Sequence, residues 1–273
     1  MRLRREVRFC LADTVAGGPV LNSWAGGLSG GAIAPFIVLR AIVSGSVDEW
    51  TGYVCNITFI DRLLRDRAIP YLRQAWTESG GRDMSPARST AALWELLEGH
   101  SPNGTRLECL ELRPTPYQGY RAFRGELPMI VMTESFEFAA SHRLCRPDFS
   151  EEQNRGVFGK CCNPNGHGHN YVLEVSVAGE PHPKTGAVVD HLAFQTTVKE
   201  RVIDRFDHRH LNSDCPEFAN LNPTLENITG VIWDLLAGRF APARLHAVRV
   251  YETARTWAER SDGHESVDKR DSP

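Results

Sequence analysis

Hydrophobic and polar residues follow the same order in two long parts of the chain. They alternate through residues 39–43 (LRAIV) and 173–177 (LEVSV), as they do in a strand with one buried face. A turn containing Gly, Thr or Pro follows in each part, and a second short strand is predicted to end near residues 52–57 (GYVCNI) and 186–191 (GAVVDH). Each part is therefore predicted to begin with a pair of strands.

Two helices and a last strand are predicted next in the C-terminal part. Residues 192–206 carry apolar side chains close to helical intervals, at Leu192, Val198, Val202 and Phe206. Residues 224–240 form a second predicted helix, with Thr224 as its N-cap and an apolar face of Ile228, Ile232 (or Val231) and Leu235. A strand over residues 245–253 follows, so the pattern predicts an α+β fold with helices on one face of an antiparallel sheet.

The two parts also share identical residues at a nearly constant spacing. Seven identities align without a gap at an offset of 134 positions, from Val172 against Val38 to Val188 against Val54. Further on, Trp233 aligns with Trp94 at an offset of 139 positions. Because the order is kept over most of both parts, we interpret the chain as two tandem domains. They cover residues 1–125 and residues 126–259, and a polar tail over residues 260–273 is predicted to be disordered.

Composition narrows the classes of function. The chain has 273 residues and a net charge of −3, and its basic residues are nearly matched by acidic ones, which argues against a nucleic-acid partner.

Pro35 and Arg40 interrupt the apolar run over residues 32–43, which is predicted to be a buried strand. The apolar run behind the basic N-terminus is too short for a signal peptide or a membrane span, so we predict a cytoplasmic protein with no membrane partner. Seven scattered cysteines are predicted to be free thiols.

Histidines carry the first sign of chemistry. Residues two apart on a strand project to the same face, so His167 and His169 can direct two imidazoles at one point. His142 ends another alternating segment and supplies a third. Three histidines with an open position are typical of catalytic zinc, whereas structural zinc is closed by four protein ligands. Cys161 is then either the fourth ligand of a structural site or a nearby thiolate base or nucleophile in a catalytic site.

Six short motifs extend this pattern over residues 130–256. They are FEFAASHRL, FGKCCNPNGHGHNY, TGAVVD, DHRHLN, PTLENI and VYET, in that order. Together they resemble the 6-pyruvoyl-tetrahydropterin synthase family, which also includes the 6-carboxytetrahydropterin synthases of the queuosine pathway. The resemblance implies two tandem tunnelling-fold (T-fold) domains, each a four-stranded antiparallel sheet with two helices on one face, which assemble into β-barrels by oligomerisation.

The resemblance also implies a role for each matching residue. One Zn²⁺ per chain would be held in the C-terminal domain by three histidines, His142, His167 and His169. The implied catalytic residues are Cys161, Asp207 and His208. The implied anchors of the pterin substrate are Glu252, Glu226 and Thr224. Cys162 stands where the family commonly has Asn, so a second thiol lies beside the implied base.

The activity that the resemblance implies is the conversion of 7,8-dihydroneopterin triphosphate to 6-pyruvoyl-tetrahydropterin with loss of triphosphate. Five residues separate Cys161 from His167, as in the pyruvoyl-forming enzymes, whereas the 6-carboxy-forming enzymes usually have three. The 6-carboxytetrahydropterin product is the alternative, and whether Mg²⁺ accompanies the triphosphate is left open. Two other readings compete: a pterin-binding or scaffold module without catalysis, and a purely structural zinc knuckle.

The N-terminal domain is predicted to be catalytically inactive. The positions that align with the metal ligands, the catalytic pair and the pterin anchors hold Ile33, Pro35, Arg73, Gln74, Ala87 and Pro114. None of these residues can bind zinc or anchor a pterin. A tandem chain of this kind is predicted to form a homotrimer that mimics a hexamer of single domains, because exposed sheet edges favour assembly.

Overall fold

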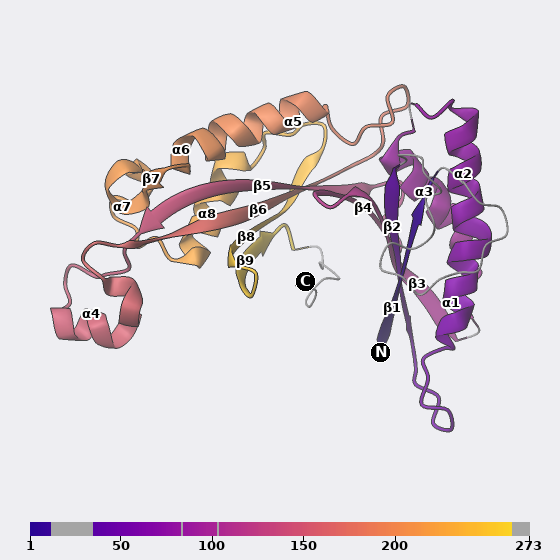
Figure 1. Ribbon diagram of the computed structural model, residues 1–273, viewed down its shortest axis with the longest axis horizontal. Coiled ribbons are helices and arrows are strands. Elements are labelled where there is room, and N and C mark those ends of the chain that lie inside the picture. The colour runs from indigo at the N-terminus through magenta and orange to yellow at the C-terminus, as the bar shows by residue number, and fades with distance from the viewer. Residues whose placement is uncertain (12–34, 83, 103, 264–273) are drawn as a thin grey trace. The chain divides into compact units, whose positions relative to one another are not determined.

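The computed structural model describes residues 1–11, 35–82, 84–102 and 104–263, and the chain divides into two compact units (Figure 1). Unit 1 comprises Met1–Met132 and Ala178–Val188, and unit 2 comprises Thr133–Val177 and Val189–Pro273. The first division falls between Met132 and Thr133, just after the start of a long strand, β5 (Ile130–His142).

Unit 1 contains four strands joined as neighbours in chain order. They are β1 (Arg2–Cys10), β2 (Phe36–Gly45), β3 (Thr105–Thr115) and β4 (Gln118–Phe123), and each pairs antiparallel with the next. Val7 lies opposite Leu39, and Leu39 lies opposite Leu112, so apolar side chains meet across the strands. Strand β2 alternates between buried and more exposed residues, so one of its faces is buried, as the alternation over residues 39–43 predicts.

Three helices accompany these strands: α1 (Ile57–Leu63), α2 (Ile69–Glu78) and α3 (Pro86–Leu97). A π-helical segment, Leu64–Ala68, joins α1 to α2. Figure 1 shows all three helices on one side of β1–β3, and α3 packs against β3 and β4. Asn56 caps α1 and Ser85 caps α3, each by accepting a backbone N–H bond near the start of the helix. The core between the layers includes Leu39, Leu64, Leu72, Trp94 and Leu110, which are all almost completely buried.

Unit 2 contains most of β5, then β6 (His167–Gly179), β8 (Arg244–Thr253) and β9 (Thr256–Ser261), which are neighbours in that order. Strands β8 and β9 pair antiparallel, with Ala247 opposite Ser261. A two-residue strand, β7 (Arg209–His210), runs parallel to the end of β5, where Ala140 lies opposite Arg209. The antiparallel sheets with attached helices agree with the predicted α+β class. Strand β9 includes Arg260 and Ser261, which were predicted to belong to the tail, and residues 264–273 lie outside the described part.

The helices of unit 2 repeat the order found in unit 1. A first run consists of α5 (His191–Val198), a π-helical segment Lys199–Ile203 and α6 (Asp204–Phe206). The last long helix, α8 (Leu225–Leu236), packs against β8 and β9, and Thr224 caps it as predicted. Shorter elements are α4 (Glu151–Phe158), a 3₁₀ turn Gly159–Cys162, α7 (Leu211–Asp214) and a 3₁₀ turn Pro216–Phe218.

Both helical runs bury residues at a spacing of four. In unit 2 these residues are Phe194, Val198, Val202 and Phe206, and in unit 1 they are Ile60, Leu64, Ala68 and Leu72. Four residues of α-helix turn by about 40° more than a full turn, so a continuous α-helix would carry this series away from the core. A π-helical turn holds more residues and returns the series to the buried side. Leu192, predicted to lie on the apolar face, is instead 75% exposed.

Two short strands predicted from the sequence are absent from the described residues. The segment after β6 forms a closed loop, in which His182 N–H donates to Ala187 O (2.9 Å) and Gly186 N–H donates to His182 O (2.7 Å). These backbone groups bond within the loop, so they cannot join a ladder. The corresponding segment after β2 is likewise a turn, where Gly52 N–H donates to Asp48 O (2.8 Å). Among the described residues, no helix has the length and apolar character needed to cross a membrane.

Candidate metal and catalytic site

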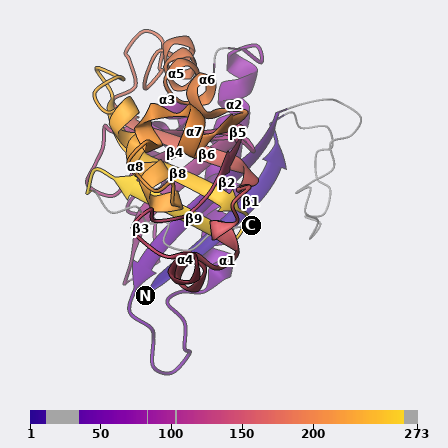
Figure 2. The same ribbon diagram turned by 90° about the vertical axis from the view of Figure 1, so that its left-hand side faces the viewer.

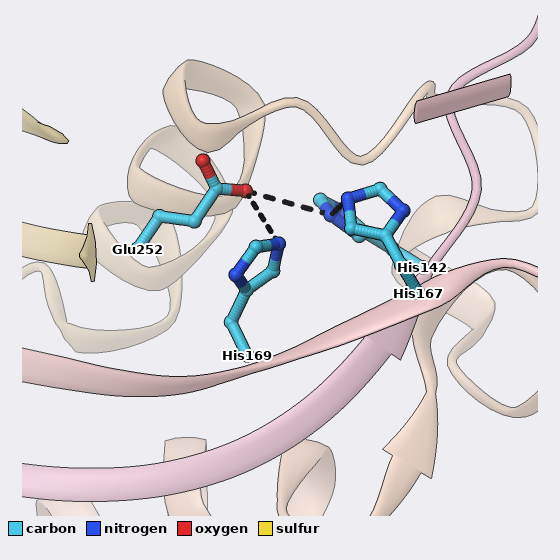
Figure 3. A group of neighbouring side chains, drawn as sticks. All are labelled: His142, His167, His169 and Glu252. Carbon is cyan, nitrogen blue, oxygen red and sulfur yellow. Dashed lines mark hydrogen bonds and ion pairs between the residues drawn. The ribbon is translucent and has the colours of Figure 1, made fainter. Parts of the chain in front are cut away.

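Three histidines and one glutamate come together in unit 2 from the ends of three strands. His167 and His169 lie at the start of β6, His142 is the last residue of β5, and Glu252 is near the end of β8. One potential ligand atom from each of these residues lies within 4.8 Å of the others. Among the described residues, this is the one group of three or more His, Cys, Asp or Glu side chains close enough to hold a metal ion. Figure 3 shows the three rings and the carboxylate directed at a common point. The i, i+2 spacing on β6 puts two of the rings on one face, and the two neighbouring strands supply the rest.

Distances within this group are short. The Nε2 atoms of His142 and His167 are 3.1 Å apart, and Oε1 of Glu252 lies 3.1 Å from Nε2 of His169 and 3.5 Å from Nε2 of His142. The His142 side chain is almost completely buried. Three ring nitrogens and one carboxylate oxygen therefore surround one small volume. A coordinated cation would stabilise this arrangement.

Hydrogen bonding fixes the form of His142. Its Nδ1 lies 2.8 Å from the carbonyl oxygen of Pro223, which can only accept, so Nδ1 carries the proton. In the neutral ring, Nε2 then presents a lone pair toward His167 and Glu252. Burial lowers the pKa of His142, and burial also lowers the pKa of His169, although the charge of Glu252 opposes this. Neutral imidazole with its second nitrogen held by a carbonyl is the metal-binding form of histidine.

Several buried polar atoms in this cluster have no hydrogen-bond partner among the described residues. They are Nδ1 of His167, Nε2 of His169 and the hydroxyl of Tyr171. The contact between His169 and Glu252 is close, but it lacks hydrogen-bond geometry. Because unpaired buried polar groups cost free energy, this concentration of them indicates a site completed by a bound ion or molecule.

Tyr171 is a member of the cluster that the sequence pattern did not single out. Its ring is fully buried, stacks on Phe138 at 5.0 Å between centroids and meets the ring of His169 edge-on at 5.5 Å. Burial, followed by the negative charges of Glu252 and Cys161, raises the pKa of Tyr171, so its hydroxyl stays protonated and can donate a hydrogen bond. Its position two residues after His169 on β6 is the signal that could have identified it.

Asp207 and His208 form a second group beside the histidines. Oδ1 of Asp207 accepts the Ala139 N–H (2.8 Å), and Oδ2 lies 2.8 Å from Nδ1 of His208. The Ala139 N–H and then His208 lower the pKa of Asp207, so it remains a carboxylate. His208 adopts a left-handed backbone (φ 57°), which the bond from its own N–H to Ala139 O supports, and its side chain is 81% exposed. Asp207 thus orients an imidazole that faces solvent.

A pocket of about 660 Å³ connects the two groups. His169 and His208 both line it, together with the backbone of β5 around Ala140. Strand β7 follows His208 directly and pairs with Ala140 and Ser141 of β5, which fixes this geometry. One implied metal ligand, His169, and one member of the implied catalytic pair, His208, therefore line the same cavity.

Cys161 and Cys162 have different environments. Both belong to the 3₁₀ turn Gly159–Cys162, but Cys162 is buried and its thiol donates to Gly159 O at 3.1 Å. Cys161 is only partly buried, and its carbonyl oxygen accepts the Leu144 N–H (2.9 Å). Cys161 is not part of the four-residue metal group, although its charge is close enough to affect Tyr171. All seven cysteines are free thiols, as predicted.

The other implied residues lie outside the metal group. Oγ1 of Thr224 accepts the Asn227 N–H (3.3 Å) as the N-cap of α8, and Glu226 is an exposed residue in the first turn of that helix. In unit 1 the aligned positions are Pro35 before β2, Arg73 and Gln74 on α2, Ala87 on α3 and Pro114 on β3. Ile33 lies outside the described residues.

Comparisons with known proteins find related sequences and related solved structures. Residues 131–262 match the family model described as 6-pyruvoyl tetrahydropterin synthase. The chain is 42% identical over 122 residues to the human protein named 6-pyruvoyl tetrahydrobiopterin synthase, which covers 45% of this chain and 84% of that protein. It is 34% identical over 103 residues to 6-carboxy-5,6,7,8-tetrahydropterin synthase of Rickettsia conorii, covering 37% of this chain and 64% of that protein. The solved structure of Caenorhabditis elegans 6-pyruvoyl tetrahydropterin synthase is 34% identical, with 49% of this chain and 96% of that chain covered and a TM-score of 0.47.

Proposed function

Because the chain belongs to the 6-pyruvoyl tetrahydropterin synthase family, we propose that its C-terminal unit converts 7,8-dihydroneopterin triphosphate to 6-pyruvoyl-tetrahydropterin and releases inorganic triphosphate. One observation carries the proposal. The ring nitrogens of His142, His167 and His169 converge beside a pocket that is also lined by His208, so a metal group and a proton-transfer group serve one cavity.

The three histidines fit a Zn²⁺ ion. His142 is held by Pro223 with its Nε2 lone pair directed inward, and Nε2 of His167 lies 3.1 Å from that nitrogen. The unpaired buried Nε2 of His169 is an atom that a metal ion would satisfy. A bound Zn²⁺ would act as a Lewis acid toward the hydroxyl oxygens of the substrate side chain. Three histidine ligands leave a position open for those oxygens, which distinguishes this arrangement from a structural zinc knuckle.

Proton transfer is assigned to the chain's own residues. The Cys161 thiolate removes a carbon-bound proton from the substrate side chain. His208, held by Asp207, exchanges a proton at the neighbouring carbon, while the C–O bond to the triphosphate breaks and the triphosphate leaves with the bonding electron pair. The side chain then tautomerises. Two side-chain carbinol carbons are oxidised to ketones, while the third side-chain carbon loses its C–O bond and the C6=N5 bond of the ring is reduced. These changes balance within one molecule, so the reaction needs no external oxidant or nicotinamide.

Glu252 is assigned to the pterin ring. A carboxylate can accept two parallel N–H bonds from an aminopyrimidinone, and such charge-assisted bonds are strong. Its 3.1 Å distance from His169 would also suit a fourth metal ligand. We assign the anchoring role because a fourth protein ligand would close the position that substrate oxygens require. Thr224 and Glu226 are proposed to line the same end of the substrate.

The experiment that tests this function is product analysis. The zinc-loaded chain is incubated with 7,8-dihydroneopterin triphosphate, and the pterin products are identified by mass spectrometry. We expect 6-pyruvoyl-tetrahydropterin and inorganic triphosphate, since five residues separate Cys161 from His167. Release of the 6-carboxy compound alone would favour the alternative activity, which the Rickettsia relative's name also suggests. Binding of pterin without turnover would indicate a non-catalytic module.

We also propose that unit 1 is a degenerate copy of the same fold that retains an assembly role. The shared order of helix, π-helical segment and helix, and the four buried positions spaced by four residues, support a duplication. The aligned site positions in unit 1 carry no metal ligand. The proposed assembly is a homotrimer that mimics a hexamer of single domains, and light scattering that gives the mass of a monomer would contradict it.

A further inference from the structure

A second pocket in unit 2 lies beside the turn that carries the cysteines. It has a volume of about 680 Å³ and is lined by residues of α4, by Arg143, which follows β5, and by the segment from Gly159 to Pro164 except Cys161. The histidine cluster does not line it. Figure 1 and Figure 2 both show α4 set apart from α5 and α6, so this pocket belongs to the cysteine end of the unit.

The side chains around this pocket carry an excess of positive charge. Arg143, Arg155 and Lys160 line it, and Glu151 is the opposing carboxylate. In the described part of the chain, neither the Arg155 guanidinium nor the Lys160 ammonium makes a hydrogen bond or ion pair with another residue. Nearby Arg146 shows the contrast, because Asp148 binds it through two bonds of 2.9 and 2.7 Å. The pocket therefore holds cations that are available to an anion.

The backbone that carries these cations is firmly held. Ser150 and Gln153 form a reciprocal capping box at the start of α4, and buried Asn154 bonds to the backbone at Arg146 and Phe149. On the other side, Nε of Arg143 donates to the Cys162 carbonyl (3.1 Å). Arg143 also lines the pocket. The backbone around this pocket therefore needs no ordering when a ligand binds, which removes one entropic cost of binding.

We propose that this pocket binds the triphosphate group of the substrate and holds inorganic triphosphate after elimination; the inference rests on the proposed function. Lys160 and Cys162 flank the proposed base Cys161 in sequence, and Arg143 follows the metal-cluster residue His142. One turn thus presents the thiolate to the carbon that loses its proton and the cations to the departing oxygens. Guanidinium groups match phosphate oxygens in pairs, and positive charge stabilises the leaving group as its negative charge develops.

The test uses the full chain with zinc bound and inorganic triphosphate as the probe, titrated by calorimetry. The double variant Arg155→Ala/Lys160→Ala removes the two unpaired cations. Its control, Arg146→Ala/Lys199→Ala, removes one Arg and one Lys from the same unit, both paired with aspartates outside the pocket. We expect the pocket variant to bind triphosphate at least about tenfold more weakly than the control, because charge-assisted bonds are lost. Both variants should bind unphosphorylated dihydroneopterin equally and melt at similar temperatures.

Steady-state kinetics distinguish substrate from free product. The pocket variant should raise KM for dihydroneopterin triphosphate and weaken inhibition by inorganic triphosphate, and the control should change neither. Equal triphosphate affinity in the two variants would overturn the inference. If both bound triphosphate more weakly than the unchanged chain and to the same extent, the effect would be one of general electrostatics. Triphosphate binding that depends on the pocket residues, without turnover of the substrate, would refute the proposed function but not the assignment of the pocket as a triphosphate site. Normal turnover with an unchanged KM in the pocket variant would refute the pocket alone.

Discussion

Replacing Asp207 with Asn tests the proposed proton-transfer pair with little change of shape. Asp207 accepts hydrogen bonds on both oxygens, from the Ala139 N–H and from Nδ1 of His208, each at 2.8 Å. An amide has one oxygen and one NH₂ group, so it cannot accept both bonds. If its oxygen keeps the backbone bond, its NH₂ group faces Nδ1 of His208. The ring then favours the tautomer with its proton on Nε2, so Nε2 changes from a hydrogen-bond acceptor to a donor.

The size of the effect follows from the bond that is lost. A hydrogen bond to a charged group contributes about 1.5–3 kcal/mol. The His208 side chain is 81% exposed, so water competes for it and the lower part of that range, about 1.5–2 kcal/mol, applies. At about 1.4 kcal/mol for each factor of ten, kcat should fall about 10- to 30-fold. KM should change little, because neither residue is proposed to hold the pterin.

The assay combines kinetics with a direct view of the ring. Turnover of dihydroneopterin triphosphate gives kcat and KM, and ¹⁵N NMR of the histidine side chains shows which nitrogen of His208 carries the proton. Asp204→Asn is the matched control, since Asp204 lies in the same helical run and pairs with exposed Lys199. Unchanged kcat in Asp207→Asn, with the ring tautomer reversed and the fold intact, would show that His208 does not exchange the proton.

Three further predictions concern other residues. Glu252→Gln should retain one zinc per chain by atomic absorption but weaken pterin binding by about tenfold or more, since a charge-assisted acceptor is lost; loss of the zinc would instead identify Glu252 as a ligand. Cys161→Ala should abolish turnover and keep zinc, whereas Cys162→Ala should keep turnover and lower the free energy of unfolding by about 1 kcal/mol, and the reverse pattern would contradict the assigned roles. Burial by itself would raise the pKa of Glu111, but the surrounding guanidinium groups, led by Arg40 at 2.9 Å, outweigh this effect, so the pKa of Glu111 lies below its usual 4.5. The Glu111 carboxylate therefore stabilises the fold at pH values above about 4.5. Glu111→Gln should therefore lower stability by about 3 kcal/mol at neutral pH in urea titrations, with the difference shrinking as the pH falls below about 4.5; a pH-independent difference would refute the ion-pair explanation.

Local pattern was enough to predict several elements. Alternation predicted the strand that contains Leu173, and the N-cap signal placed the start of α8 at Thr224. The same patterns failed where backbone groups bonded locally, as in the closed loop from His182 to Ala187, or where a segment is short and polar, as in α4. Strand β1 was also not predicted, although Val7 and Phe9 are buried in it.

The sequence by itself indicated the histidines of the cluster but not Tyr171. The i, i+2 spacing of His167 and His169 on a strand requires both rings to lie on one face, and this follows from strand geometry alone. The resemblance then selected His142, Asp207 and Glu252 from distant parts of the chain. Only the tertiary structure decided how these groups meet, because contacts between remote segments depend on which strands become neighbours.

Backbone partners were equally invisible in the sequence. The Pro223 carbonyl that fixes the tautomer of His142 and the Ala139 N–H that holds Asp207 could have come from any residue type. The difference between Cys161 and Cys162 also arose only on folding, when one thiol was buried against Gly159 and the other was left partly exposed. Sequence spacing specifies side-chain direction within an element, whereas burial and long-range hydrogen bonds are properties of the packed chain.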